Sequence, residues 1–513
     1  MEQTLSYRTI KNSAYSFLSF IWPLLLSFVS IPIIIKGLGV ERYGFFILLN
    51  ASLTFFGLLD FGFGYTFFKR LSEHPEKRNL EELTKLFSSS LFLYLFIGLF
   101  SLLVLVLIPD FFIDLFKIPN NFQSSFLWFF LVLGCSFLVK MLTVPLQQIP
   151  HALQRLDISS KIALVSVTFI QLGSIIVVLL GYGILSLLII QLLAAIFVFI
   201  CHTFFWFRLA RFLKFKFSFS VKIFKDMFKD GVLIFIQNTM SSILSQLDKI
   251  ILGLFWGPSI VTYYSSAQTL PEKINLLSFS LSSCFSPVFS YLGIKENMEH
   301  ARNIFRRSIR FMTFISGGLV VVVITFGYKF IEFWLGKNFA DQASVALIFL
   351  AFTYFFMSIN TICGQFLSGN KKLGFLSGSS VLLAVMNVLL VLILIPLYKI
   401  NGAALAYLLS TFLIPFFLLI IEHRYLGGKY REIVKYYFKH FFKIFLIGFL
   451  SYILATLLLP MVNDLLLVIV FSGFTFMFYV LLFKLFGFLE TEDVVVLKNF
   501  FGAFVLKFKG MKK

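Results

Sequence analysis

Charged residues are scarce in this chain. Asp, Glu, Lys and Arg together make up only 13% of its 513 residues, whereas 59% are hydrophobic and the mean hydropathy is +0.94. A soluble domain of this length needs far more polar surface. The composition therefore excludes a soluble protein and predicts an integral membrane protein.

Cysteine and histidine are rarer still. The four cysteines, Cys135, Cys201, Cys284 and Cys363, fall far apart within apolar segments, so no disulfide framework is expected. The six histidines are scattered, with neither the spacing of a metal site nor that of a nucleophile and its base. No Walker motif is present. We therefore expect no cofactor, no metal, no direct use of ATP and no enzymatic activity.

The chain consists largely of long apolar runs. Most of them have about the 20 residues that a helix needs to cross the hydrocarbon core. The sequence thus predicts an all-α integral membrane protein with about fourteen transmembrane helices. Their expected ranges are 12–35, 44–67, 87–108, 123–145, 162–181, 184–207, 230–254, 261–292, 311–333, 345–367, 375–397, 402–421, 444–460 and 465–483.

The basic residues are unevenly divided between the two sides of the membrane. With the N-terminus on the first side, loops and termini there carry 35 of the 44 Lys and Arg, and the opposite side carries six. Such a surplus marks the cytoplasmic side. We therefore expect a multi-pass protein of the cytoplasmic (inner) membrane with both termini in the cytoplasm. The net charge of +20 then reflects topology and contact with anionic headgroups, so nucleic acid is not an expected partner.

A weak internal repeat organises the spans. The segments "GVERYGFF" (39–46) and "GPSIVTYY" (257–264) lie 218 residues apart, and both enter an even-numbered span. The segments "YGILSL" (182–187) and "NGAALA" (401–406) lie 219 apart, and both open the last span of their half. Because an even number of spans preserves orientation, the repeat predicts two parallel six-helix lobes around a central cleft, the design of alternating access.

This repeat also predicts the domain boundaries. The N-lobe would be 1–207, followed by a basic cytoplasmic linker at 208–229 and a C-lobe at 230–422. The remainder, 423–513, would add two extra helices and a basic cytoplasmic tail.

Two segments resemble the O-antigen and polysaccharide flippases of the multidrug/oligosaccharidyl-lipid/polysaccharide exporter superfamily. The segment "LDKIILGLFWGPSIVTYYSSAQTLPEKI" (247–274) is similar to that family's seventh-to-eighth span signature. The segment "LGVERYGFFILLNASLTFFGLLDFGFG" (38–64) is similar to its first loop and second span. That span usually closes on Asp-Leu-Gly, where this chain has Asp60-Phe61-Gly62.

The resemblance implies both a fold and an activity. The fold is two six-helix lobes plus two extra helices. The activity is movement of an undecaprenyl-pyrophosphate-linked oligosaccharide across the cytoplasmic membrane by alternating access, for O-antigen or capsule-like surface polysaccharide. The implied partners are the lipid-linked oligosaccharide, membrane lipids, and polysaccharide polymerase with its chain-length machinery.

Four charged residues lie within the seventh and eighth spans, where each costs roughly 2.5–3.5 kcal/mol on insertion scales. They are Asp248, Lys249, Glu272 and Lys273. Pairing across the spans, Asp248 with Lys273 or Lys249 with Glu272, is one interpretation. The other is a cation that faces the cavity and binds pyrophosphate, with Lys249 favoured. Pro271 is expected to kink the eighth span.

In the first lobe, Asp60 and Lys140 lie toward the inside ends of the second and fourth spans. An ion pair within the lobe is the first interpretation, and a coupling-ion or proton site at Asp60 is the second. Gly57, Gly62 and Gly64 permit close helix approach there, which favours packing as the main role.

Amide side chains within spans are candidate contacts for a glycan, with interhelical hydrogen bonds as the alternative for each. The cleft candidates among them are Asn238, Gln246 and Gln268, and further amides are Asn50, Gln237, Asn360, Gln365 and Asn387.

Two other functions stay open. A drug or cation exporter of the same superfamily would favour carboxylates over lysine in its cleft, and the intramembrane set here is mixed. A membrane polysaccharide polymerase or ligase would carry a large outside loop, whereas the longest outside loop expected here has about 14 residues, 109–122.

Overall fold

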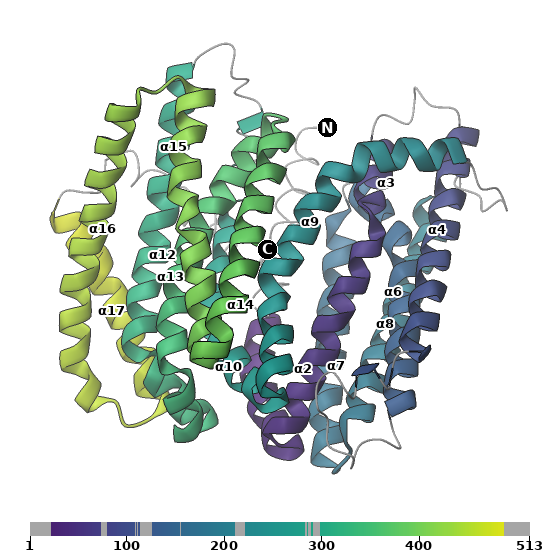
Figure 1. The fold of residues 1–513 in the computed structure, drawn as a ribbon, viewed down its shortest axis with the longest axis horizontal. Coiled ribbons are helices and arrows are strands. Elements are labelled where there is room, and N and C mark those ends of the chain that lie inside the picture. Colours follow the sequence, from purple (N-terminus) through teal and green to yellow (C-terminus); the bar gives the residue numbers. More distant parts are fainter. Residues whose placement is uncertain are drawn as a thin grey trace, which may run out of the picture. The chain divides into compact units, whose positions relative to one another are not determined.

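The computed structural model describes residues 22–72, 80–107, 109, 111–112, 126–153, 155–210, 221–282, 285, 289–290 and 298–486. Their regular structure is helical throughout, in two compact units that meet in sequence between Thr262 and Tyr263 (Figure 1). Cys135, Cys201 and Cys363 are free thiols, and Cys284 lies outside the described residues.

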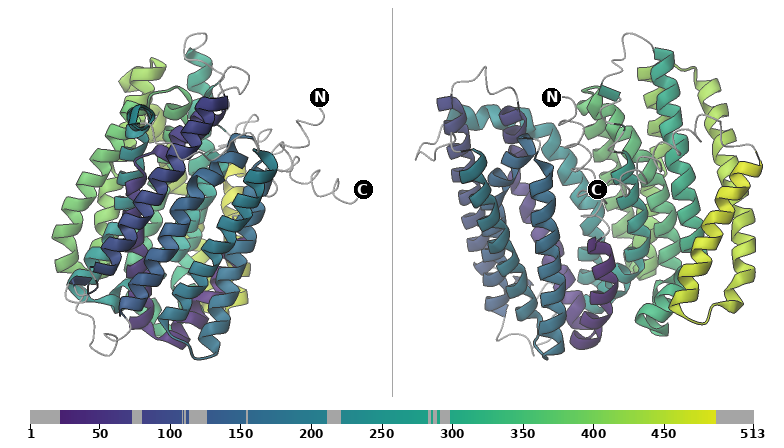
Figure 2. Two further views of the ribbon diagram at one scale, coloured as in Figure 1. Left: turned by 90° about the vertical axis from the view of Figure 1, so that its right-hand side faces the viewer. Right: turned by 180° about the vertical axis from the view of Figure 1, so that it is seen from behind.

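The first unit contains the helix Trp22–Leu38 and eight labelled helical segments. These are α2 (Val40–Phe56), η1 (Gly57–Asp60), α3 (Phe63–Ser72), α4 (Leu80–Leu107), α6 (Phe126–Ala152), α7 (Leu156–Leu179), α8 (Ile184–Leu209) and α9 (Val221–Trp256). Figure 2 shows the long helices of this unit running side by side. Of these, α6 packs on both α4 and α8.

The second unit is entered by α10, which begins just before the boundary. Its segments are α10 (Pro258–Ser282), α12 (Met298–Leu335), α13 (Lys337–Gly369), α14 (Leu373–Thr411), α15 (Leu413–Leu426), α16 (Tyr430–Leu458), η5 (Leu459–Met461) and α17 (Leu465–Leu485). The α12–α13 pair forms its centre, and α14 packs on α13.

All fourteen predicted spans lie on helical segments over most of their described residues, and the all-α membrane fold is confirmed. Within the described part of the chain, ten helical stretches are long and apolar enough to cross a membrane. The polar helices α9 and α10 are not among the ten, which reflects the charges in the seventh and eighth predicted spans.

The second predicted span is broken, which hydropathy did not predict. Helix α2 ends at Phe56, one 3₁₀ turn follows, and α3 starts at Phe63. The break contains Phe61 with φ 48° and Gly62 with φ 75°. A Cβ on Gly62 would lie 2.5 Å from the carbonyl oxygen of Gly231, so the glycine lets the backbones of α3 and α9 touch.

The backbone repeats at the offset seen in the sequence. Gly39 (φ 87°) and Gly257 (φ 81°) each separate two helices, and they lie 218 residues apart. Gly181 (φ 82°) and Lys399 (φ 52°) show the same spacing, one in the α7–α8 turn and the other at the kink inside α14. Residues with a positive φ therefore recur at the same offset as the sequence similarity.

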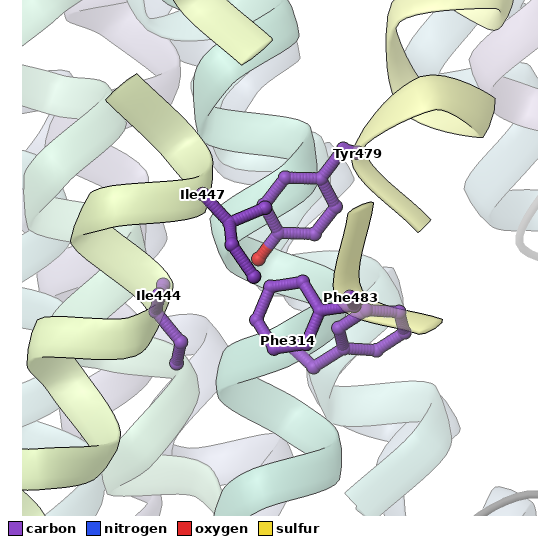
Figure 3. Packing of buried hydrophobic residues seen from close by; sticks show 5 residues of the cluster. All are labelled: Phe314, Ile444, Ile447, Tyr479 and Phe483. Atoms are coloured by element: carbon purple, nitrogen blue, oxygen red, sulfur yellow. The ribbon is translucent and has the colours of Figure 1, made fainter. Parts of the chain in front are cut away.

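The last two helices pack on the second unit through an aromatic cluster. Tyr479 and Phe483 of α17 and Ile444 and Ile447 of α16 surround Phe314 of α12 (Figure 3). The Phe314 and Tyr479 rings stack with centroids 5.6 Å apart. The two extra helices are thus anchored to α12 by buried apolar surface.

Grouping by contacts and grouping by sequence repeat assign α9 differently. In space, α9 packs on α2 and α3 and belongs with the first unit. The repeat instead makes it the first span of the second half, so the lobe boundaries at 207, 230 and 422 stay predictions.

Candidate functional site

Helix α9 carries a polar face that is open rather than buried. Asn238 and Ser241 are exposed, and Ser242, Ser245 and Lys249 are half-buried. These positions lie within about 100° of one another on a helix and extend over about 16 Å along its axis. The Lys249 Nζ donates to Gln246 Oε1 at 3.2 Å, which holds the ammonium beside this face.

Asp248 lies on a different side of α9. Its side chain is 1% exposed, and its Oδ1 accepts the backbone N–H of Lys249 at 2.8 Å. The same helix packs on α2, with Gly253 against Leu48. Asp248 is therefore buried, whereas Lys249 is half-buried.

Helix α10 presents a second polar face in the other unit. Glu272 is exposed, and Ser265, Thr269 and Lys273 are half-buried. The helix continues through Pro271, so the expected kink does not interrupt it. Because Asp248 and Lys249 belong to one unit and Glu272 and Lys273 to the other, the two cross-span pairings stay predictions.

The predicted ion pair between Asp60 and Lys140 is wrong. Asp60 Oδ1 instead accepts the Tyr94 hydroxyl of α4 and, at 3.3 Å, the backbone N–H of Gly64 at the start of α3. Lys140 is exposed halfway along α6, and among the described residues it forms no ion pair. Two neutral donors thus satisfy the carboxylate, because the 3₁₀ turn directs it toward α4.

Gly62 and Gly64 have the packing role expected of them. A Cβ on Gly64 would lie 3.1 Å from both the Tyr94 hydroxyl and the Val144 side chain. Around Gly57, in contrast, no neighbouring atom lies within 4 Å of such a Cβ. Close approach is therefore confirmed at two of the three glycines.

Several candidate amides are buried or form hydrogen bonds within the protein. Gln268 is buried, and its Nε2 donates to the Tyr354 hydroxyl of α13 at 2.8 Å. Asn50 donates to the Phe46 carbonyl of its own helix. Asn387 is 1% exposed, but neither of its amide atoms has a hydrogen-bond partner among the described residues. Of the three cleft candidates among the amides, Asn238 is exposed. Gln246 accepts the hydrogen bond from Lys249.

The sequence did not single out two polar groups that the structure does. One is Tyr94, whose hydroxyl is the donor to Asp60; a lone tyrosine in an apolar run gives no signal of its partner. The other is a buried ion pair at Glu422 of α15, whose side chain is 0% exposed. Arg306 of α12 donates its Nε to Glu422 Oε1 at 2.7 Å, and its guanidinium lies 4.3 Å above the Tyr436 ring of α16.

The segment "ALQRLD" (152–157), which connects α6 to α7, contains a local ion pair. The Arg155 Nε donates to Asp157 Oδ1 at 3.0 Å, and Asp157 is buried. This hydrogen bond to the carboxylate raises the pKa of Arg155 above its ordinary value. The motif therefore caps the start of α7 electrostatically.

Residues 38–344 match the family model described as "Polysaccharide biosynthesis protein". Among curated proteins, the chain is 22% identical over 364 residues to the "Putative O-antigen transporter" of Shigella flexneri, covering 69% of this chain and 83% of that protein. It is 21% identical over 411 residues to the protein of the same name in Escherichia coli K12, covering 77% and 92%.

Solved structures show the same fold. The lipid II flippase MurJ, in an inward closed conformation, aligns with a TM-score of 0.71 at 18% identity, covering 92% of this chain and 98% of that one. An inward-facing multidrug-resistance transporter of the MATE family aligns with a TM-score of 0.62 at 15% identity, covering 78% and 93%. At these identities the likeness establishes the fold and leaves the substrate open.

Proposed function

Because the chain belongs to the polysaccharide biosynthesis protein family, we propose that it moves undecaprenyl-pyrophosphate-linked oligosaccharide units across the cytoplasmic membrane by alternating access. The units would supply surface polysaccharide of the O-antigen or capsule type. The names of its curated relatives and its MurJ-like fold support this proposal.

The observation that carries the proposal is the open polar face of α9. It combines an accessible cation, Lys249, with the hydroxyls of Ser242 and Ser245 and the amide of Asn238. A cation suits the diphosphate, because charge-assisted hydrogen bonds are about twice as strong as neutral ones. Hydroxyls and amides suit the hydroxyl-rich glycan. We propose Glu272 and Lys273 of α10 as further candidate contacts for the substrate.

Transport by these residues requires no covalent chemistry. Lys249 neutralises part of the diphosphate charge and so lowers the free energy needed to bring the headgroup into the protein. The lipid tail remains in the bilayer. Net movement is then driven by an ion gradient, by membrane potential or by consumption of the product outside.

Glycan export at matched protein levels tests the role of Lys249. The host is a strain whose surface glycan depends on this gene. Loss of one charge-assisted hydrogen bond costs about 1.5–3 kcal/mol, so Lys249→Ala should reduce export tenfold or more. Lys249→Arg, which keeps the cation, is the matched control and should retain most export.

The double variant Lys249→Ala/Glu272→Ala separates binding from pairing. If Lys249 served only to neutralise Glu272, the double variant would recover both abundance and export. If Lys249 binds the diphosphate, only abundance recovers. Normal export from a well-expressed Lys249→Ala protein contradicts the proposed site, and purified protein that joins glycan units contradicts the proposed function.

A further inference from the structure

Helix α16 displays a row of cations that nothing else in the described chain engages. Arg431, Lys435 and Lys439 follow one another at four-residue intervals, and all three are exposed. Among the described residues, none of them forms an ion pair or a side-chain hydrogen bond. Residues spaced by four lie on adjacent turns, so the row is continuous over about 12 Å.

A row of exposed phenylalanines runs beside these cations on the same helix. Its members are Phe438, Phe442, Phe445 and Phe449, which are between 52% and 74% exposed. They stack in pairs, with ring centroids 6.5 Å apart for the first pair and 6.3 Å for the second. One face of α16 therefore passes from cationic to aromatic along its length.

The opposite face of α16 fixes the direction in which the two rows point. Ile433, Tyr437, Ile444 and Ile447 are buried against the second unit. In Figure 1, α16 lies at an edge of that unit. The cations and phenylalanines consequently face away from the helices that α16 packs on.

Other cations of the second unit are used differently. Arg306 is paired with the buried Glu422, Arg302 donates its Nε to the Leu426 carbonyl at 3.0 Å, and Lys429 lies 4.0 Å from Glu432. These groups hold helices together or pair locally. Among the described residues the row on α16 has no such partner, so it is available to a group outside the described chain.

From this arrangement we propose that the outer face of α16 is a binding site for anionic phospholipids. The phosphate and glycerol headgroup contacts Arg431, Lys435 and Lys439, and the acyl chains lie along the phenylalanine row. Lysine and arginine near the ends of membrane helices extend toward the headgroups, and each contributes about 1 kcal/mol of attraction to an anionic surface. The site is distinct from the polar face of α9 and does not depend on the transported substrate.

Native mass spectrometry of the full-length protein in detergent tests this site. Wild-type protein is titrated with phosphatidylglycerol and, separately, with phosphatidylcholine. Phosphatidylglycerol should bind more tightly, and Arg431→Gln/Lys435→Gln/Lys439→Gln should lose that preference by about fivefold for each cation removed.

The matched control removes the same charge elsewhere. Lys69, Lys371 and Lys484 are exposed lysines at other helix ends, and their triple replacement by glutamine should leave the preference unchanged. Phe438→Ala/Phe442→Ala should weaken binding of the long-chain lipid but not of the soluble headgroup glycerophosphoglycerol. Equal loss in both triple variants would show a general effect of net charge and overturn the proposal.

Two further results would also overturn it. One is equal binding of the two lipids by the wild type. The other is displacement of phosphatidylglycerol by millimolar inorganic pyrophosphate, which would identify a site for free phosphate. A Lys435→Arg/Lys439→Arg protein that keeps the wild-type preference supports the site, because both residues retain their charge.

Discussion

Asp60 illustrates how a single side chain is used at a helix break within the membrane. Its carboxylate accepts two hydrogen bonds, one from the Gly64 backbone and one from the Tyr94 hydroxyl. A partly buried carboxylate is costly without donors, so the Tyr94 hydroxyl contributes to the stability of this turn. Lys140 of α6 forms no ion pair with Asp60 in the described part of the chain.

This arrangement predicts energetic coupling between Asp60 and Tyr94. We expect the effects of Asp60→Asn and Tyr94→Phe to be non-additive by about 1–3 kcal/mol in denaturant unfolding, because each variant removes the same hydrogen bond. Lys140→Gln is the control and should change stability by less than about 0.5 kcal/mol. Strong coupling of Asp60 to Lys140 would contradict the observed hydrogen bonding.

At the scale of helical elements, the contact between α3 and α9 depends on Gly62. Its φ of 75° and the 2.5 Å approach to the Gly231 carbonyl both exclude a side chain. Gly62→Ala should therefore destabilise the protein by about 1–3 kcal/mol, measured as a lower denaturation midpoint. Gly57→Ala is the matched control, since Gly57 has φ −60° and no neighbouring atom lies within 4 Å of a Cβ placed on it. Equal effects of the two would argue against the backbone contact.

The buried ion pair between Arg306 and Glu422 predicts a different pattern of stability. Arg306→Met leaves a fully buried carboxylate without its cation and should cost about 3–5 kcal/mol, whereas Arg306→Met/Glu422→Leu should recover most of that loss. Lys429→Ala breaks the exposed pair with Glu432 and should cost less than about 1 kcal/mol. Chemical denaturation of the four proteins provides the measurement, and equal losses in the single and double variants would contradict burial as the cause.

Hydropathy predicted the positions of the helices because each run of about 20 apolar residues is itself the cause of membrane spanning. It did not predict the break after Phe56, since Asp60 and Gly62 barely change the average over a window. Nor could it choose the partner of Asp60. Tyr94 is 34 residues away on another helix, and only the orientation of the 3₁₀ turn decides between it and Lys140.

At the scale of the whole molecule, the distribution of basic residues predicts the orientation in the membrane. A reporter fused at Lys513 should be active in the cytoplasm, and one inserted in the loop near Asn120 should be active outside, because 35 of the 44 Lys and Arg then lie inside. Fusions after Arg208 and Lys371 serve as further cytoplasmic points. Outside activity of the Lys513 fusion would reverse the predicted topology.

The paired turns at Gly181 and Lys399 have a consequence for the history and engineering of the chain. Glycine suits a positive φ and lysine does not, yet both residues have one, 218 residues apart in the two halves. A positive φ thus occurs at equivalent positions of the repeat, although only one of the two carries glycine. Each half can therefore serve as an internal reference for the other, so that a substitution tested at a turn of one copy identifies its counterpart in the second.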